Sequence, residues 1–163
     1  MYDKQIKLLI VDDEVKFLDA IARRLELRAF DVTKASNGLV ALDEARYSKF
    51  DLALVDLKMP GMNGQEVLRV LKQHHKFLEI VILTGYPTVD TAVECTKLGA
   101  FDYLSKPCDM NLLLDTLRRA YEARLKKKFE HDRQRLEKIE LMSVGSSPLG
   151  ILKALSGLDD EEK

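Results

Sequence analysis

Leu52-Ala53-Leu54-Val55-Asp56 is the stretch from which the architecture of this chain can be worked out, because four apolar residues end abruptly in a carboxylate. A turn-rich run, Leu57-Lys58-Met59-Pro60-Gly61-Met62-Asn63-Gly64, follows directly. A short apolar run bounded by turn signals is typical of a fully buried strand. We therefore expect Asp56 to lie where a buried strand reaches the surface.

Predicted strands and helices alternate on both sides of this stretch. Apolar runs predict strands at 6–11, 31–35, 52–55, 79–83 and 100–104. Apolar residues at helical spacing predict helices at 15–27, 40–47, after Asn63, at 88–98 and after Asp109. Alternation of this kind favours an α/β fold, in which helices cover both faces of a parallel sheet.

Polar side chains follow four of these predicted strands. Asp12 and Asp13 follow the first strand, and Asp56 follows the third. Thr84 follows the fourth strand, and Lys106 comes shortly after the fifth. Sites in open parallel sheets form beyond the carboxyl ends of the strands. We therefore expect three acids, a hydroxyl and an ammonium to meet at one edge of the sheet.

This set of groups suits phosphoryl transfer to a carboxylate. Neighbouring carboxylates repel one another unless cations offset their charge, and hard oxygen ligands in an open cluster suit Mg²⁺. A carboxylate can be a covalent nucleophile, and phosphoryl transfer needs mainly positioning and charge neutralisation. We therefore expect Asp56 to accept a phosphoryl group in the presence of Mg²⁺. Thr84 and Lys106 would contact the phosphoryl oxygens.

Each of these residues also has an ordinary interpretation. Asp12 or Asp13 could cap the first predicted helix, Thr84 could be a turn residue, and Lys106 could be a solvated loop lysine. Their joint placement at four strand ends is what favours a site over four unrelated features.

The combination of Asp12-Asp13, Asp56, Thr84 and Lys106-Pro107 resembles the receiver domain of two-component response regulators, in the CheY-like superfamily. The runs 56–64 and 99–107 carry the same resemblance, which extends over about residues 5–125. It implies a flavodoxin-like (βα)5 fold, doubly wound around a parallel sheet with strand order 2-1-3-4-5.

The resemblance also implies roles for individual residues. Asp56 is implied to take its phosphoryl group from a sensor histidine kinase or a phosphotransfer protein. The metal site residues are implied to be Asp12, Asp13, Asp56 and the backbone carbonyl of Lys58.

Switching residues are implied in the same way. Thr84 is implied to move toward the phosphate, and Tyr103 is implied to turn inward into the space that Thr84 leaves. An aromatic residue on a buried strand is more often plain core, and its position three residues before Lys106 is what favours the switch. The Lys106–Pro107 bond is implied to be cis. A downstream protein effector would contact the face formed by helix 88–98, strand 100–104 and the last helix.

The last predicted helix continues beyond the part that resembles a receiver. Neither Gly nor Pro occurs between Asp109 and Gly145, and residues 118–140 are rich in Lys, Arg and Glu, which favour helix. We expect a receiver domain at 5–124 and a helical extension at 125–142. A linker with a short amphipathic and charged tail should follow at 143–163.

Apolar residues recur along this helix at the spacing of a loose heptad repeat. The repeat consists of Leu114, Leu117, Tyr121, Leu125, Phe129, Leu136 and Ile139. It predicts a homodimeric coiled coil, with a solvated single helix as the alternative. The run Lys126-Lys127-Lys128 is more typical of a solvated face than of a nucleic-acid patch.

Composition argues against several classes of protein. Charged residues make up 33% of the chain and the formal net charge is -1, which favours neither nucleic-acid binding nor disorder. Two cysteines, Cys95 and Cys108, indicate no disulfide framework. The sequence shows neither a signal peptide nor the roughly 18 apolar residues of a membrane span. We expect a cytoplasmic protein without membrane or direct nucleic-acid contacts.

Three functions compete at this point. The first is a stand-alone receiver that signals through protein contacts. The second is the regulatory receiver fragment of a DNA-binding transcriptional activator whose effector domain is absent. The third is a phosphatase with an aspartyl nucleophile, but such enzymes usually need an acid two residues after the nucleophile, where this chain has Lys58. We therefore expect no enzyme beyond self-phosphorylation from small donors and autodephosphorylation.

Overall fold

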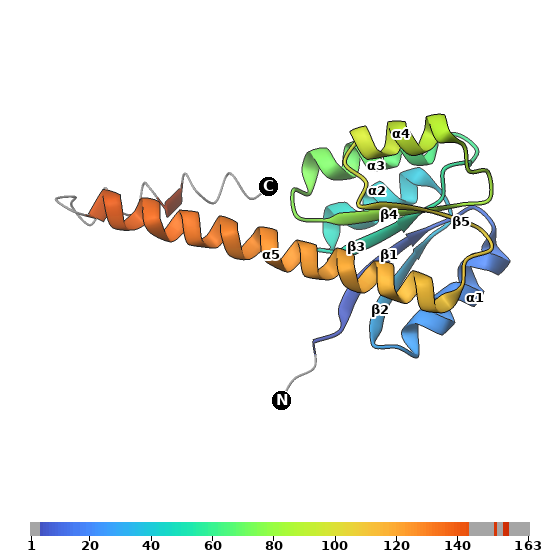
Figure 1. The fold of residues 1–163 in the computed structure, drawn as a ribbon, viewed down its shortest axis with the longest axis horizontal. Coiled ribbons are helices and arrows are strands. Elements are labelled where there is room, and N and C mark those ends of the chain that lie inside the picture. The colour runs from blue at the N-terminus through green and yellow to red at the C-terminus, as the bar shows by residue number, and fades with distance from the viewer. Residues whose placement is uncertain (1–3, 144–151, 153–154, 157–163) are drawn as a thin grey trace.

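The computed structural model describes residues 4–143, 152 and 155–156, and strands and helices alternate through this part of the chain (Figure 1). The strands are β1 (Ile6–Val11), β2 (Phe30–Ala35), β3 (Leu52–Val55), β4 (Glu79–Thr84) and β5 (Asp102–Ser105). The helices are α1 (Val15–Glu26), α2 (Gly38–Tyr47), α3 (Gly64–His74), α4 (Val89–Lys97) and α5 (Met110–Ser143).

The strands form one parallel sheet in the order β2-β1-β3-β4-β5, which confirms the predicted flavodoxin-like topology. β3 lies at the centre, where Val55 pairs with Val11 of β1 on one side and with Ile82 of β4 on the other. All four residues of β3 are buried. Continuous burial explains why this strand is apolar at every position until Asp56.

Helices cover both faces of the sheet. α1 and α5 pack on one face, and α2, α3 and α4 pack on the other (Figure 1). Alternate residues of β3 serve the two layers: Leu52 and Leu54 belong to the α1 side, and Ala53 and Val55 to the α2–α4 side. Both faces of β3 are therefore buried under helices.

Local signals set most of the element boundaries. The Asn63 side chain accepts a hydrogen bond of 3.0 Å from the N–H of Glu66 and caps α3 as predicted. Gly99, just after α4, has a φ of 98°, which suits glycine at a helix end. β5 begins two residues later than predicted; the N–H of Ala100 bonds to the Cys95 carbonyl at the end of α4, and the N–H of Phe101 makes the first bond to β4, at the Ile80 carbonyl.

α5 is a continuous helix of 34 residues that runs on past the edge of the sheet (Figure 1). Leu114 and Leu117, the first members of the predicted heptad repeat, are buried against the domain's own sheet. Leu125, Phe129 and Leu136 are exposed. The repeat therefore serves two purposes, since its first members complete the core and its later members reach solvent. Most of the predicted linker and tail lies outside the described residues.

Candidate functional site

Two neighbouring strands bring the three predicted acids together. Asp12 and Asp13 follow β1 and Asp56 follows β3, and the Asp56 N–H extends the pairing of these strands with a 2.9 Å bond to the Val11 carbonyl. Carboxylate oxygens of the three acids lie within 4.8 Å of one another. Asp12 and Asp56 are only 2% and 5% exposed, so their charges are shielded from water. The predicted cluster therefore exists at the carboxyl edge of the sheet.

Neither Asp12 nor Asp13 caps α1. The N-cap residue is Glu14, and its side chain makes no capping hydrogen bond. Asp12 instead accepts a 2.9 Å bond from the Glu14 N–H, which turns its carboxylate back toward the site. The ordinary interpretation of these acids as helix caps is therefore wrong.

Lys106 supplies the cation of the cluster. Its Nζ lies 2.6 Å from Asp12 Oδ2, 3.6 Å from Glu14 Oε1 and 3.9 Å from Asp56 Oδ2. Its backbone N–H donates to the Thr84 carbonyl at 2.8 Å, and its peptide bond to Pro107 is cis, as the resemblance implied. The loop after β5 thus carries the ammonium over the ends of the neighbouring strands.

Burial and charge shift the proton affinities of this cluster. Burial raises the pKa of Asp56 to about 6; the Asp12 and Asp13 charges add to this effect and the Lys106 charge opposes it. Burial alone would lower the pKa of Lys106, but its hydrogen bond to Asp12 and the charges of Asp12, Asp56 and Glu14 outweigh burial and raise it. Lys106 therefore stays positively charged, but its charge does not fully offset the effect of burial on the Asp56 carboxylate.

These residues fit a divalent cation. The three carboxylates provide hard oxygen donors at close range. The buried Oδ1 of Asp56 also has no hydrogen-bond partner among the described residues, which leaves one acceptor of the cluster available. The fourth implied ligand, the Lys58 carbonyl, lies two residues after Asp56 in the loop between β3 and α3.

The two implied switch residues make defined hydrogen bonds. Thr84 is fully buried, and its Oγ1 accepts a 3.2 Å bond from the Tyr86 N–H. The hydroxyl of Tyr103 lies 2.7 Å from Thr91 Oγ1 and accepts a 3.3 Å bond from the Thr88 N–H. Tyr103 is thereby fastened to the first turn of α4.

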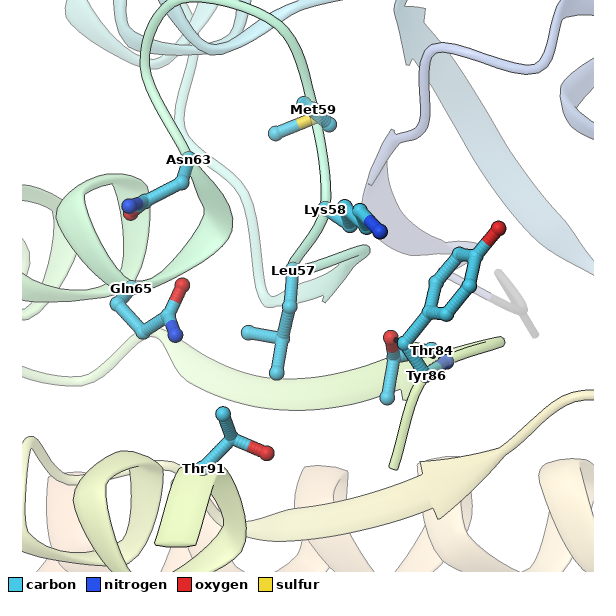
Figure 2. Close-up of a pocket in the computed structure, with 8 residues that line it drawn as sticks. All are labelled: Leu57, Lys58, Met59, Asn63, Gln65, Thr84, Tyr86 and Thr91. Atoms are coloured by element: carbon cyan, nitrogen blue, oxygen red, sulfur yellow. Dashed lines mark hydrogen bonds between the residues drawn. The ribbon is translucent and has the colours of Figure 1, made fainter. Parts of the chain in front are cut away.

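A pocket of about 280 Å³ lies between the loop after β3 and the start of α4. Its lining comprises Leu57, Lys58, Met59, Asn63, Gln65, Thr84, Tyr86 and Thr91 (Figure 2). Lys58 faces Tyr86 across one end of it, with Nζ 4.1 Å from the ring centre. Lys58 and Tyr86 belong to the loops after β3 and β4, and they line the same pocket as Thr84.

Sequence reasoning missed two neighbours of Lys106. Glu14 lies 3.6 Å from Nζ, and the ring centre of Phe17 lies 4.1 Å from it. Glu14 directly follows the two aspartates, so its position in the chain was a usable signal. Phe17 lies within the predicted helix 15–27, but its contact with Lys106 depends on the loop after β5, which lies about 90 residues away in the sequence.

Comparison with known proteins identifies the family. Residues 8–118 match the response regulator receiver domain. This chain belongs to the response regulator receiver family. A solved receiver domain protein (CheY-like) from Methanospirillum hungatei JF-1 superposes on this receiver with a TM-score of 0.73 at 28% identity, covering 76% of this chain and 98% of that one.

Curated relatives of this receiver are longer proteins. It is 40% identical over 120 residues to the transcriptional regulatory protein ZraR of Klebsiella oxytoca, and 34% identical over 131 residues to the regulatory protein AtoC of Escherichia coli strain K12. The matches cover 74% and 80% of this chain but only 27% and 28% of those relatives. The receiver therefore spans about a quarter of the length of either relative.

Proposed function

We propose that this receiver is a phosphorylation switch in which Asp56 accepts the phosphoryl group. The observation that carries the proposal is the position of Asp56. Its buried carboxylate lies close to two further acids and 3.9 Å from an ammonium, and one of its oxygens has no hydrogen-bond partner among the described residues. Family membership supports it, since the resemblance to receiver domains implies the same role for Asp56.

The reaction forms an acyl phosphate. One Asp56 carboxylate oxygen forms a bond to phosphorus while the bond from phosphorus to the donor atom breaks, and the leaving group keeps the electron pair. The donor atom is a histidine nitrogen of a sensor kinase or phosphotransfer protein, or an oxygen of a small acyl phosphate. Asp12, Asp13, Asp56 and the Lys58 carbonyl would hold Mg²⁺, which when bound neutralises charge on the carboxylates and the phosphoryl oxygens. Lys106 and Thr84 donate to those oxygens.

A phosphoryl group on Asp56 changes the surface that a downstream protein recognises. A phosphoryl group adds roughly two negative charges and three acceptor oxygens. Thr84 turns toward them and Tyr103 turns inward, which breaks the bonds of Tyr103 to α4. A downstream protein then recognises the altered surface of α4, β5 and α5. A second copy of the chain is a further proposed partner through the exposed part of α5.

A second proposal concerns the whole protein. Both curated relatives are named as regulatory proteins, one of them transcriptional, and each is far longer than this chain. We propose that this receiver controls a transcriptional regulator, either from within the same protein or through protein contacts. Cytoplasmic location remains a prediction that rests on the family. Among the described residues, no helix has the length and apolarity to cross a membrane.

Intact-mass measurement tests the phosphoacceptor. The protein is incubated with Mg²⁺ and acetyl phosphate, and we expect a gain of one phosphate that is stable in acid and labile in base. Asp56→Asn should abolish the gain, and chelation of Mg²⁺ should prevent it. Asp43→Asn, at an exposed acid on α2, serves as the control and should behave as wild type. Equal phosphate gain in Asp56→Asn would refute the assignment.

A further inference from the structure

Lys106 has an aromatic neighbour as well as its acidic ones. Phe17, in the first turn of α1, places its ring centre 4.1 Å from the ammonium. The Lys106 side chain is only 13% exposed, so little water competes for this contact. A cation over an aromatic face is attracted by the ring quadrupole, and the attraction grows when the pair is shielded from water.

Two other cation–ring contacts in the described chain are weaker by the same criteria. Arg119 lies 5.9 Å from the Phe101 ring centre with a side chain that is 49% exposed, and Lys76 lies 5.5 Å from the Phe77 ring centre. The contact of Lys58 with Tyr86 is as short as that of Phe17, but both of its residues are exposed. Phe17 therefore has the close and shielded contact, and its partner belongs to the acid cluster.

The ionic partners of Lys106 are the groups that a loaded site would need. Asp12 bonds at 2.6 Å to the Lys106 ammonium, which must also reach the phosphoryl oxygens. Asp12 and Asp56 both belong to the acid cluster that would hold the metal. Divalent charge on these acids would weaken their hold on Lys106 and repel it. Glu14 is the remaining acid, and its side chain is 66% exposed, so solvent screens its attraction.

We propose that Phe17 is a positioning residue that keeps the Lys106 ammonium beside Asp56 when its ionic partners are engaged elsewhere. The ring carries no net charge, so metal binding does not remove it as a partner. It also uses no acceptor atom, so the ammonium N–H groups stay available for phosphoryl oxygens. This inference rests on the proposed function of Asp56, because it gives Phe17 a role only if a phosphoryl group arrives there.

A series of fluorinated phenylalanines at position 17 tests the proposal. Added fluorine atoms withdraw charge from the ring face with little change in its size, so they weaken a cation–ring contact step by step. We expect the rate of phosphorylation by acetyl phosphate to fall with each fluorine, by about fivefold in total. Phe17→Leu should show a similar loss of rate, whereas Phe17→Tyr keeps the aromatic face and should react at the wild-type rate. The same series at Phe101 is the control and should leave the rate unchanged.

A second readout needs neither metal nor phosphate. The methylene protons of Lys106 next to Nζ should show the upfield NMR shift of protons above an aromatic ring, and Phe17→Leu should abolish it. A flat rate across the fluorinated series, or an unchanged Lys106 shift in Phe17→Leu, would overturn the role of Phe17. Wild-type protein that takes no phosphate at all would instead overturn the function of Asp56, so the two failures are distinguishable.

Discussion

At the scale of single residues, the charge of Asp56, the proposed phosphoacceptor, lowers the stability of the folded protein. Its pKa of about 6 lies above the ordinary value of 3.8, mainly because of burial. Between about pH 4 and pH 6 the folded protein therefore keeps a proton that the unfolded chain has already lost. Protonated Asp56 therefore raises the free energy of unfolding at low pH, and this contribution is lost as the pH rises through 6.

Removing the charge should reverse this effect. In metal-free buffer at pH 7, Asp56→Asn should raise the free energy of unfolding by on the order of 2 to 3 kcal/mol, since one pKa unit corresponds to about 1.4 kcal/mol. The difference from wild type should shrink as the pH falls from 6 toward 4. Urea unfolding across this range measures it. A difference that is constant with pH would show that the Asp56 charge is not the cause.

Gly64 shows how closely the backbone approaches the site. Its N–H donates to the Leu57 carbonyl at 2.9 Å, and a Cβ atom at this position would lie 2.2 Å from the Asp56 carbonyl oxygen. Gly64→Ala should therefore displace the loop after β3, lower the free energy of unfolding by about 2 to 3 kcal/mol and slow phosphorylation.

Gly61 in the same loop is the matched control for Gly64. It has a φ of 75°, but no atom of the described residues lies within 4 Å of a Cβ added there. Gly61→Ala should cost about 1 kcal/mol through backbone strain alone. Thermal unfolding and the acetyl phosphate assay separate the two variants, and equal effects would argue against a steric role for Gly64.

At the scale of elements, the base of the α5 extension is bound to the domain by polar contacts. Arg124 donates from Nε to Asp51 Oδ1 at 3.0 Å and from a terminal nitrogen to the Phe77 carbonyl at 2.8 Å. Lys127 Nζ lies 2.6 Å from Glu79 Oε1, and the Glu79 side chain is 2% exposed. Asp51 directly precedes β3, and Asp56 follows that strand; Glu79 is the first residue of β4, and Thr84 is its last. We propose that the receiver extends at least to Lys127 rather than ending at residue 124.

Loss of Lys127 should leave the Glu79 carboxylate buried without its ammonium. Lys127→Met should lower the free energy of unfolding by on the order of 2 kcal/mol, and Glu79→Gln in the same chain should recover part of the loss. Lys126→Met, at the exposed neighbouring position, is the control. Chemical unfolding measures the stability of the wild type, of Lys127→Met, of the double variant and of Lys126→Met. Equal stability of the Lys127 and Lys126 variants would place the domain boundary earlier.

The first turn of α4 holds Tyr103 in its observed orientation. Thr91→Val removes the hydroxyl that lies 2.7 Å from the Tyr103 oxygen while keeping the shape of the side chain. We expect the inward orientation of Tyr103 to become several-fold more populated, because a bond worth about 1 kcal/mol is lost. Fluorotyrosine NMR measures the two populations. Thr96→Val is the control on the same helix, since the Thr96 hydroxyl bonds to the Ala92 carbonyl instead.

At the scale of the whole molecule, we propose that two copies associate through the exposed part of α5. Leu125, Phe129 and Leu136 are 48%, 72% and 63% exposed, and they lie four and seven residues apart on a helix that extends beyond the sheet. If they form the predicted coiled coil, replacing all three by glutamine should convert a dimer into a monomer in light scattering. Replacing exposed Leu27 and Leu39 should not change the mass. A wild-type monomer would refute the dimer.

Much of this architecture could be predicted because its signals are local or periodic. β3 was predicted at its observed bounds, since its four residues are all apolar and buried and an aspartate stands on either side of them. The acids, Thr84 and Lys106 could be assigned to one edge because parallel strands direct their carboxyl ends the same way. The division of the α5 repeat could not be predicted, since the spacing is the same whether a leucine faces its own sheet or another copy.

The sequence by itself determined the order of elements, the strand ends that carry charge and the resemblance to a receiver. These features are properties of short segments and of their succession along the chain. The tertiary structure alone decided which partners those charges meet: Lys106 beside Asp12 and Phe17, Tyr103 bonded to α4, and Arg124 and Lys127 bound to the starts of β3 and β4. Such contacts join residues far apart in the chain, and packing of the whole domain sets their distances.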